Sequence, residues 1–136
     1  EEEFTVGRAH PMIDPTIRKM RLVEEAKDPE VAVVVMDFML GYGSHSDPAG
    51  AMLGAISDAK KMAARDGRVL PMLAHVCGTE QDPQSLSEQT AKLRNAGVEV
   101  LATNALMAIE SALISRRGKI TTSILEGACK NFLEGF

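Results

Sequence analysis

The chain has 136 residues, of which 45% are hydrophobic and 25% charged, and its formal net charge is −4. This length fits one domain with a core of its own, and the composition is that of an ordinary globular protein. The sequence contains neither a broad basic cluster nor a signal peptide, and no run approaches the ~20 apolar residues of a membrane span, so we set aside nucleic acid, membranes and secretion.

The first half of the chain predicts a strand, a helix and a second strand. Residues 4–7 read as a short strand, and an Asp-Pro pair at 14–15 opens a helix to about residue 27 with Ile17, Met20 and Val23 at helical spacing. Residues 31–40, "VAVVVMDFML", are β-branched and almost continuously apolar. Such a run is typical of a strand that is covered on both faces.

The second half repeats this alternation. The Asp-Pro pair at 47–48 opens a helix that stops near Gly67, and the pair at 82–83 precedes a helix that begins near Pro83 or, through the competing capping box "SLSE", at Ser85. We expect Asn104 to cap the last helix. The expected elements are a helix over 47–65, a strand over 68–77, a helix to residue 97, a strand over 98–103 and a helix over 104–115.

Strands that alternate with helices through short loops predict right-handed βαβ units and a parallel sheet. We therefore expect an α/β fold with four or five parallel strands in one domain over residues 1–136. Residues 116–136 fit either a further helix or a fifth strand, and both remain open. Because the sequence opens with "EEEF" and not with methionine, we expect the domain to be a piece of a longer protein.

Four segments follow strands and precede helices, so we expect them to meet at the carboxyl edge of the sheet. They are 7–15, 41–50, 77–83 and 103–105. Helix N-termini carry unpaired amides and partial positive charge, which suits a phosphate or a carboxylate. An ordinary capped turn is the alternative, because Asp47 and Asp82 can occupy the same amides themselves.

The loop "GYGSHSDPAG" at 41–50 is the principal candidate, although it lacks the GK[ST] ending of a P-loop. His45 is the candidate catalytic group, as a phosphate-contacting or phosphate-accepting imidazole, and a solvated loop histidine is the alternative for it and for His10. No metal site is assigned. The candidate phosphate-binding residues are Gly41, Gly43, Ser44, Ser46, Gly50, Gly78 and Thr79.

Three further residues carry weaker signals. His75 and Cys77 fall on one face of a predicted strand, where a nucleophilic pair or a core thiol beside a histidine are the alternatives. Asp37 lies within an apolar strand, and a buried carboxylate needs a partner. Cys77 and Cys129 are expected to be free thiols in a reducing, cytoplasmic setting.

The stretches "FTVGRAHPMIDPTIR", "DPEVAVVVMDFMLGYGSHSDPAG" and "HVCGTEQDPQSL" resemble the FdrA family, whose members are related to the succinyl-CoA synthetases. The resemblance covers residues 3 to 114 and implies a flavodoxin-like three-layer α/β/α ligase domain. It also implies acid–thiol ligation through a phosphohistidine, with CoA and ATP or ADP bound by the full enzyme and no cofactor in this domain. The implied partner is a CoA-binding domain or subunit, within a homo- or hetero-oligomer.

One departure from the synthetases concerns the phosphorylated histidine. In the synthetases it follows the third strand in a Gly-His-Ala-Gly setting, whereas the matching loop here reads "CGTEQDPQ". The resemblance therefore implies the non-phosphorylated partner type of domain. FdrA relatives are also associated with carbamoyl transfer to oxamate, so a carbamoyltransferase domain is one alternative, and a non-catalytic assembly or regulatory domain is another. A flavodoxin-like cofactor binder ranks last, since the chain has one tyrosine and no tryptophan to sandwich a flavin.

Overall fold

The structure, a computed structural model, describes residue 7 and residues 9–116. The predicted strand over 4–7, apart from Gly7, lies outside the described residues, as do the segment after residue 116 and Cys129.

Helices and strands alternate through the described part of the chain, as the sequence predicts. Each of the three strands is shorter than its apolar run, because the run includes residues that lead into and out of the sheet. In chain order the elements are α1 (Thr16–Glu25), β1 (Val34–Met39), α2 (Pro48–Arg65), β2 (Met72–Cys77), α3 (Leu86–Asn95), β3 (Glu99–Leu101) and α4 (Asn104–Ser115).

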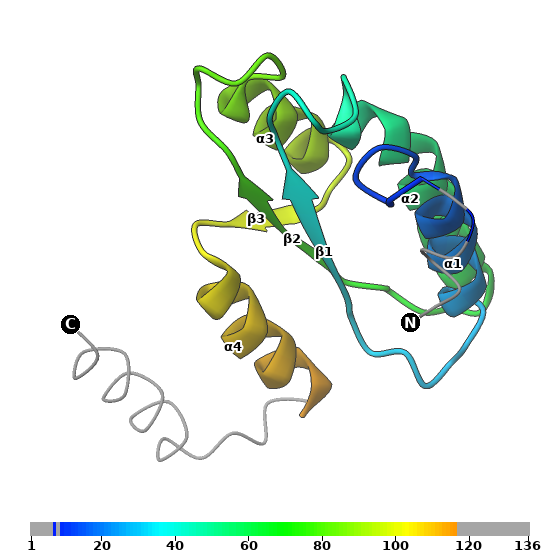
Figure 1. Ribbon diagram of the computed structural model, residues 1–136. Coiled ribbons are helices and arrows are strands. Elements are labelled where there is room, and N and C mark those ends of the chain that lie inside the picture. The colour runs from blue at the N-terminus through cyan, green and yellow to red at the C-terminus, as the bar shows by residue number, and fades with distance from the viewer. Residues whose placement is uncertain (1–6, 8, 117–136) are drawn as a thin grey trace.

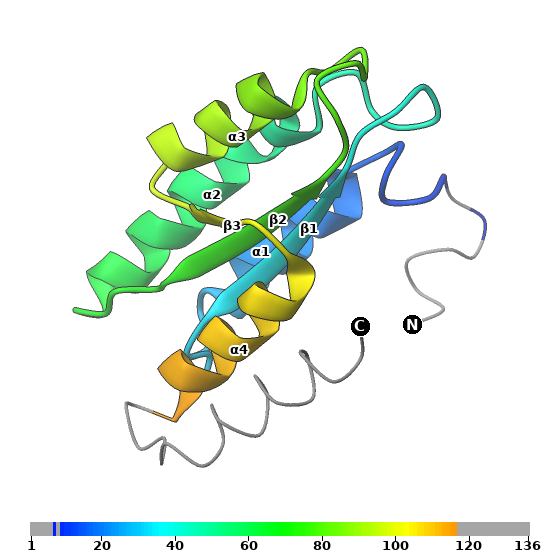
Figure 2. The same ribbon diagram turned by 90° about the vertical axis from the view of Figure 1, so that its left-hand side faces the viewer.

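The three strands form one parallel sheet in the order β1-β2-β3. The β1–β2 register runs from Val34 opposite Met72 to Met39 opposite Cys77. Helices α1, α2 and α3 lie on one side of the sheet and α4 lies on the other, as the views in Figure 1 and Figure 2 show. The prediction of a three-layer α/β/α fold with a parallel sheet is therefore confirmed.

The main core lies between the sheet and the three helices on one face. Met36 and Phe38 of β1 alternate toward this core, and Ile56 of α2 packs there with no exposed surface. On the opposite face, Leu73 of β2 and Met107 of α4 are buried at 2% and 5% exposure. The helical layer on this opposite face is thin, since α4 is the one described helix that covers it.

The Asp-Pro pairs at 47–48 and 82–83 differ in what they do. Asp47 caps α2 as predicted, with its Oδ1 accepting from the Gly50 amide at 3.0 Å and Pro48 in the first turn. Ser85, not the Asp-Pro pair at 82–83, caps α3, so the capping-box alternative is the correct one. The expected cap of α4 was wrong by one residue: the Thr103 hydroxyl accepts from the Leu106 amide at 3.1 Å.

Glycines end two of the helices, as expected from their freedom at positive φ. Gly67 and Gly97 have φ values of 70° and 71°. Lys60 of α2 donates to the carbonyl oxygens of Ala96 and Gly97 at 2.6 Å, so it satisfies the end of α3 and ties it to α2. Burial lowers the pKa of Lys60 below its usual value.

Candidate functional site

Three of the four predicted segments meet at the carboxyl end of the sheet. The Leu40 amide donates to the Cys77 carbonyl at 2.9 Å, which joins the starts of the 41–50 and 77–83 loops. The His45 amide donates to the Met12 carbonyl at 2.8 Å, which adds the segment before α1. The fourth segment lies elsewhere: Asn104 is bound to Asp37 in the middle of β1.

A buried glutamine holds the 41–50 loop in place. Gln84, at 5% exposure, accepts from the Gly41 amide at 3.0 Å and donates to the Gly41 carbonyl at 2.8 Å. Its amide group also donates to the His45 carbonyl at 3.1 Å. The loop is therefore fixed at both ends of its tip, and Tyr42 at the tip is 93% exposed.

The first-turn amides of α2 already have partners within the chain. The Ala49 amide donates to Oε1 of Gln89 at 2.9 Å, and the Gly50 amide donates to Asp47. Lys92 Nζ donates to Asp47 Oδ1 at 2.8 Å. Burial acts to raise the pKa of Asp47, but hydrogen bonds from Lys92, Gln89 and Gly50 outweigh it and hold the pKa below its usual value.

Two carboxylates also accept hydrogen bonds from other residues of the same 77–88 segment. Asp82 Oδ2 accepts from the Thr79 amide at 2.6 Å and from its hydroxyl at 3.1 Å. Glu80 accepts from the Ser87 hydroxyl at 2.9 Å, from the Ser85 hydroxyl at 2.9 Å and from the Ser87 amide at 2.8 Å, and these bonds lower its pKa. Together with Asp47, this part of the edge is more acidic than the glycine-rich loops suggest.

The predicted binding residues therefore fall into two groups. Gly41, Gly50 and Thr79 use their amides within the chain. A Cβ on Gly78 would come within 2.6 Å of Leu40, so this glycine permits a close approach of two loops. The positions left to contact a ligand from the loop are Gly43 and the hydroxyl groups of Ser44 and Ser46, for which no hydrogen bond is formed among the described residues.

His45 is half-buried, and its Nδ1 accepts from the Asp47 amide at 3.0 Å. In the neutral ring this places the proton on Nε2, which then acts as a donor. Such a ring can contact an anion, whereas nucleophilic attack by Nε2 requires the opposite tautomer. His10 has the same arrangement, because its Nδ1 accepts from the Met12 amide at 3.2 Å.

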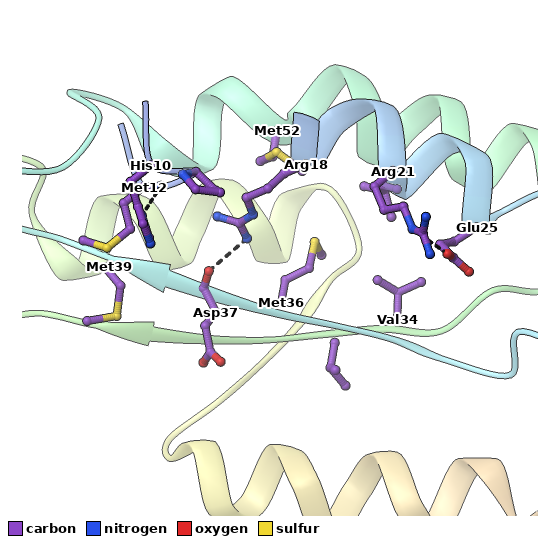
Figure 3. Close-up of a pocket in the computed structure, with 13 residues that line it drawn as sticks. His10, Met12, Arg18, Arg21, Glu25, Val34, Met36, Asp37, Met39 and Met52 are labelled. Carbon is purple, nitrogen blue, oxygen red and sulfur yellow. Dashed lines mark hydrogen bonds and ion pairs between the residues drawn. The ribbon is translucent and has the colours of Figure 1, made fainter. Parts of the chain in front are cut away.

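Asp37 is exposed on the α4 side of the sheet, contrary to the expectation of a buried group. Both of its carboxylate oxygens accept from Asn104 Nδ2 at 3.0 Å, and Figure 3 shows the carboxylate pointing away from α1. His75 lies opposite Asp37 in the sheet, with its Nδ1 3.4 Å from the Leu101 carbonyl. Cys77 is a free, exposed thiol, and no bond joins it to His75 in the described residues.

A groove of about 540 Å³ lies between the outer edge of β1 and α1. Figure 3 shows Arg18 at its centre, with one guanidinium nitrogen donating to the Asp37 carbonyl at 2.9 Å. The guanidinium also lies 5.1 Å from the centre of the Phe38 ring. Burial lowers the pKa of Arg18, while the charge of Asp37 acts to raise it.

Sequence reasoning missed the residues that organise this region. Gln84 and Gln89 follow the loop and were not distinguished from surface glutamines, although Gln89 lies in register with the buried Leu93 on α3. Arg18 was not singled out in the sequence. Its position on the same face as the buried Leu22, one turn away, was the available signal.

No group of three or more histidine, cysteine, aspartate and glutamate side chains in the described residues is placed to bind a metal ion. None of the helices described is long and apolar enough to span a bilayer.

A parallel sheet with helices on both faces and loops that meet at the carboxyl ends of its strands defines a three-layer α/β/α domain. Residues 1–114 match the family described as CoA-ligase, and the chain belongs to that family. The chain is also 55% identical over 104 residues to the uncharacterized protein YahF of Escherichia coli K12. The match covers 76% of this chain and 20% of that relative, so the chain spans about a fifth of the relative's length.

Proposed function

We propose that this chain is the ligase-type domain of an acyl-CoA-synthetase-like protein of the FdrA kind, and that it contacts a phosphate or a phosphorylated intermediate through the 41–50 loop. Its membership of the CoA-ligase family supports the reaction class, acid–thiol ligation. The observation that carries the proposed site is the rigid loop: Gln84 and Met12 hold it, while Gly43, Ser44 and Ser46 are available to an anion.

In this proposal His45 binds the anion by a hydrogen bond, and it does not become phosphorylated. Its Nδ1 is already an acceptor, so Nε2 donates toward the anion together with the hydroxyl groups of the neighbouring serines. This role agrees with a domain that assists a phosphorylated partner. A histidine in another domain or subunit would then carry the covalent intermediate.

The proposal assigns CoA and the nucleotide to other parts of the full enzyme. At the described strand ends the nearby cation, Lys92, is already paired with Asp47, and Asp82 and Glu80 add negative charge. The 41–50 and 77–83 loops contain no lysine or arginine for the several phosphates of a nucleotide, whereas the hydroxyl groups of Ser44 and Ser46 are donors for one small anion. The expected partner is therefore a CoA-binding domain or subunit, and carbamoyl phosphate remains a smaller anion that the loop could accept.

One observation favours a second function, a non-catalytic assembly domain. The first-turn amides of α2 that would bind an anion most strongly are occupied by Gln89 and Asp47. An assembly domain needs such internal capping and needs no ligand. The two functions differ in whether any anion stabilises the fold.

Thermal unfolding in separate solutions of phosphate, carbamoyl phosphate, CoA and ADP separates the two functions. A ligand at a hundred times its dissociation constant stabilises the fold by about 2.7 kcal/mol. We expect phosphate or carbamoyl phosphate to raise the melting temperature and ADP not to. A shift with none of the four compounds would contradict the ligase-type site and support the assembly domain.

Gly43→Leu is the matched variant for this test. A Cβ at Gly43 meets nothing within 4 Å, so the bulkier side chain leaves the fold intact while it obstructs the loop. Gly54→Leu places the same side chain in open space on α2 and serves as the control. The anion-dependent shift should vanish in the first variant and persist in the second, and an equal shift in both would place the anion elsewhere.

A further inference from the structure

A second cavity, of about 320 Å³, lies between α3 and β3 and is called the β3 cavity below. Its wall is one face of α3, since three lining residues follow one another at intervals of four: Leu86, Thr90 and Arg94. Residues of the two neighbouring strands and the residue after β3 complete the lining; they are Val76, Val100, Leu101 and Ala102. The β3 cavity shares no lining residue with the groove around Arg18 and includes none of the 41–50 loop.

Two polar side chains interrupt this apolar lining. Thr90 is half-buried, and its hydroxyl group forms no hydrogen bond within the described part of the chain. Arg94 donates from one guanidinium nitrogen to the Val100 carbonyl at 3.4 Å, which is a long and weak hydrogen bond. No carboxylate of the described residues lies within ion-pair distance of Arg94. Most of its five N–H groups are therefore free to bind an anion.

The helix dipole explains part of this arrangement. Lys92 and Arg94 both lie in the last turn of α3, where a positive charge is favourable. Lys92 is paired with Asp47, however, whereas Arg94 lies beside an apolar cavity that no acidic residue lines. A cation at one end of an apolar wall complements a ligand that has one negative charge and an apolar body.

The size of the β3 cavity limits the ligand. Its volume is about ten times the ~30 Å³ that one water occupies in the liquid, which suits a carboxylate with a chain of about four to eight carbons. Leu86 and Arg94 are eight residues apart on α3, or about 12 Å along the helix axis, so an extended chain of this length spans the wall. Inorganic phosphate would leave the apolar lining in contact with water.

A peptide strand is a poorer occupant of the same place. Strand addition depends on a row of free main-chain donors and acceptors along a sheet edge. β3 has three residues, and Arg94 already contacts the carbonyl of the middle one, Val100. A small molecule needs no such row, because the side chains of α3 provide its polar contacts.

We propose that the β3 cavity binds a short-chain alkyl carboxylate. The carboxylate accepts hydrogen bonds from the guanidinium group of Arg94, and the chain lies along Leu86 and Val76 with Thr90 between the two ends. The site is additional to the anion site of the 41–50 loop and does not depend on it. The class of ligand is a monocarboxylic acid with an unbranched apolar chain.

An NMR titration of the 136-residue chain with hexanoate, and separately with 1-hexanol, tests the proposal. We expect hexanoate to cause saturable shifts of the Thr90, Arg94 and Val100 amides. Hexanol should bind at least about tenfold more weakly, because hydrogen bonds to a charged group are stronger. Equal affinities for the two compounds, or no saturable shift with hexanoate, would overturn the proposal.

Arg94→Gln is the first variant, and Arg65→Gln is its control. Arg65 is exposed in the last turn of α2, so both substitutions remove a cation from the same position of a helix. We expect Arg94→Gln to lower the affinity for hexanoate about tenfold or more and to leave that for hexanol unchanged. Arg65→Gln should change neither affinity. An equal loss of hexanoate binding in both variants would mean that net charge, and not the cavity, attracts the ligand.

Ala102→Leu tests the apolar part of the β3 cavity. Ala102 and Ala91 are both exposed, but Ala102 lines the cavity and Ala91 does not. We expect Ala102→Leu to abolish the hexanoate shifts and Ala91→Leu to retain them, with similar melting temperatures for the two variants. Persistent shifts in Ala102→Leu would contradict the site.

The same titration separates this proposal from the one on the 41–50 loop. Hexanoate shifts at Gly43 and Ser44, in place of the β3 cavity, would overturn the carboxylate site and leave the loop site standing. Inorganic phosphate should leave the Thr90 and Arg94 amides unchanged. Shifts at Val100 that grow with protein concentration in the absence of hexanoate would assign the cavity to a second copy of the chain and would also contradict the proposal.

Discussion

At the scale of single residues, α2 contains two glycines in opposite environments. A Cβ on Gly50 would collide with the Asp47 carboxylate, whereas a Cβ on Gly54 meets nothing within 4 Å. Gly50→Ala should therefore expel the capping carboxylate and lower the free energy of unfolding by about 1–2 kcal/mol. Gly54→Ala should raise it by about 0.5–1 kcal/mol, because alanine loses less entropy in a helix. Urea unfolding measures both, and a stabilised Gly50→Ala variant would contradict the cap geometry.

Gln84 provides a second prediction at this scale. Replacement by alanine leaves the Gly41 amide and two loop carbonyls without their buried partner. We expect a loss of about 1–3 kcal/mol and faster hydrogen exchange at Gly41. Gln81→Ala is the matched control, because this side chain is exposed. If both variants unfold at the same urea concentration, Gln84 does not hold the loop.

At the scale of elements, α4 depends on one buried side chain. Met107 is 5% exposed and packs on the α4 side of the sheet, while its neighbour Leu106 is 49% exposed. Met107→Ala should cost about 2–5 kcal/mol through the cavity that it leaves. Leu106→Ala should change the free energy of unfolding by no more than about 0.5 kcal/mol. Equal effects in thermal unfolding would mean that α4 is held in another way.

The start of α2 should also carry a pH dependence. Because the pKa of Asp47 is held below its unfolded value, its stabilisation is present above the usual aspartate pKa of about 3.9 and is lost as pH falls through the lower folded value. Asp47→Asn should flatten this part of the stability profile. The control is Asp58→Asn, an exposed acid on the same helix. An Asp47→Asn profile that falls as steeply as that of the unmodified chain would contradict the assignment.

The elements were predictable because their signals are local. Apolar runs, capping residues and glycine stops placed every described helix and strand. The deviations were also local: Asp82 closes a turn with Thr79, so Ser85 caps α3 as the capping-box alternative predicted, and Thr103 caps α4 in place of the expected Asn104. In α1, Met20 is 68% exposed although it has helical spacing, because the buried face is the one that contains Leu22.

At the scale of the whole molecule, the sequence predicts that loops meet at the carboxyl ends of the strands, but it does not predict the hydrogen bonds that these loops form. Parallel strands bring their carboxyl ends together, which the sequence pattern implies. Which amides remain available depends on two glutamine side chains, Gln84 from the turn before α3 and Gln89 from α3 itself, and no spacing in the sequence predicts those contacts. Arg18 and its groove likewise depend on which edge of the sheet α1 covers.

The central claim is that the 41–50 loop receives an anion, and an NMR titration of the amide resonances with inorganic phosphate and with carbamoyl phosphate tests it most directly. We predict saturable shifts at Gly43, Ser44 and Ser46, with the amides of Val35 and Asp37 in β1 unchanged. Shifts confined to the groove around Arg18, or none at any concentration that leaves the fold intact, would contradict the claim.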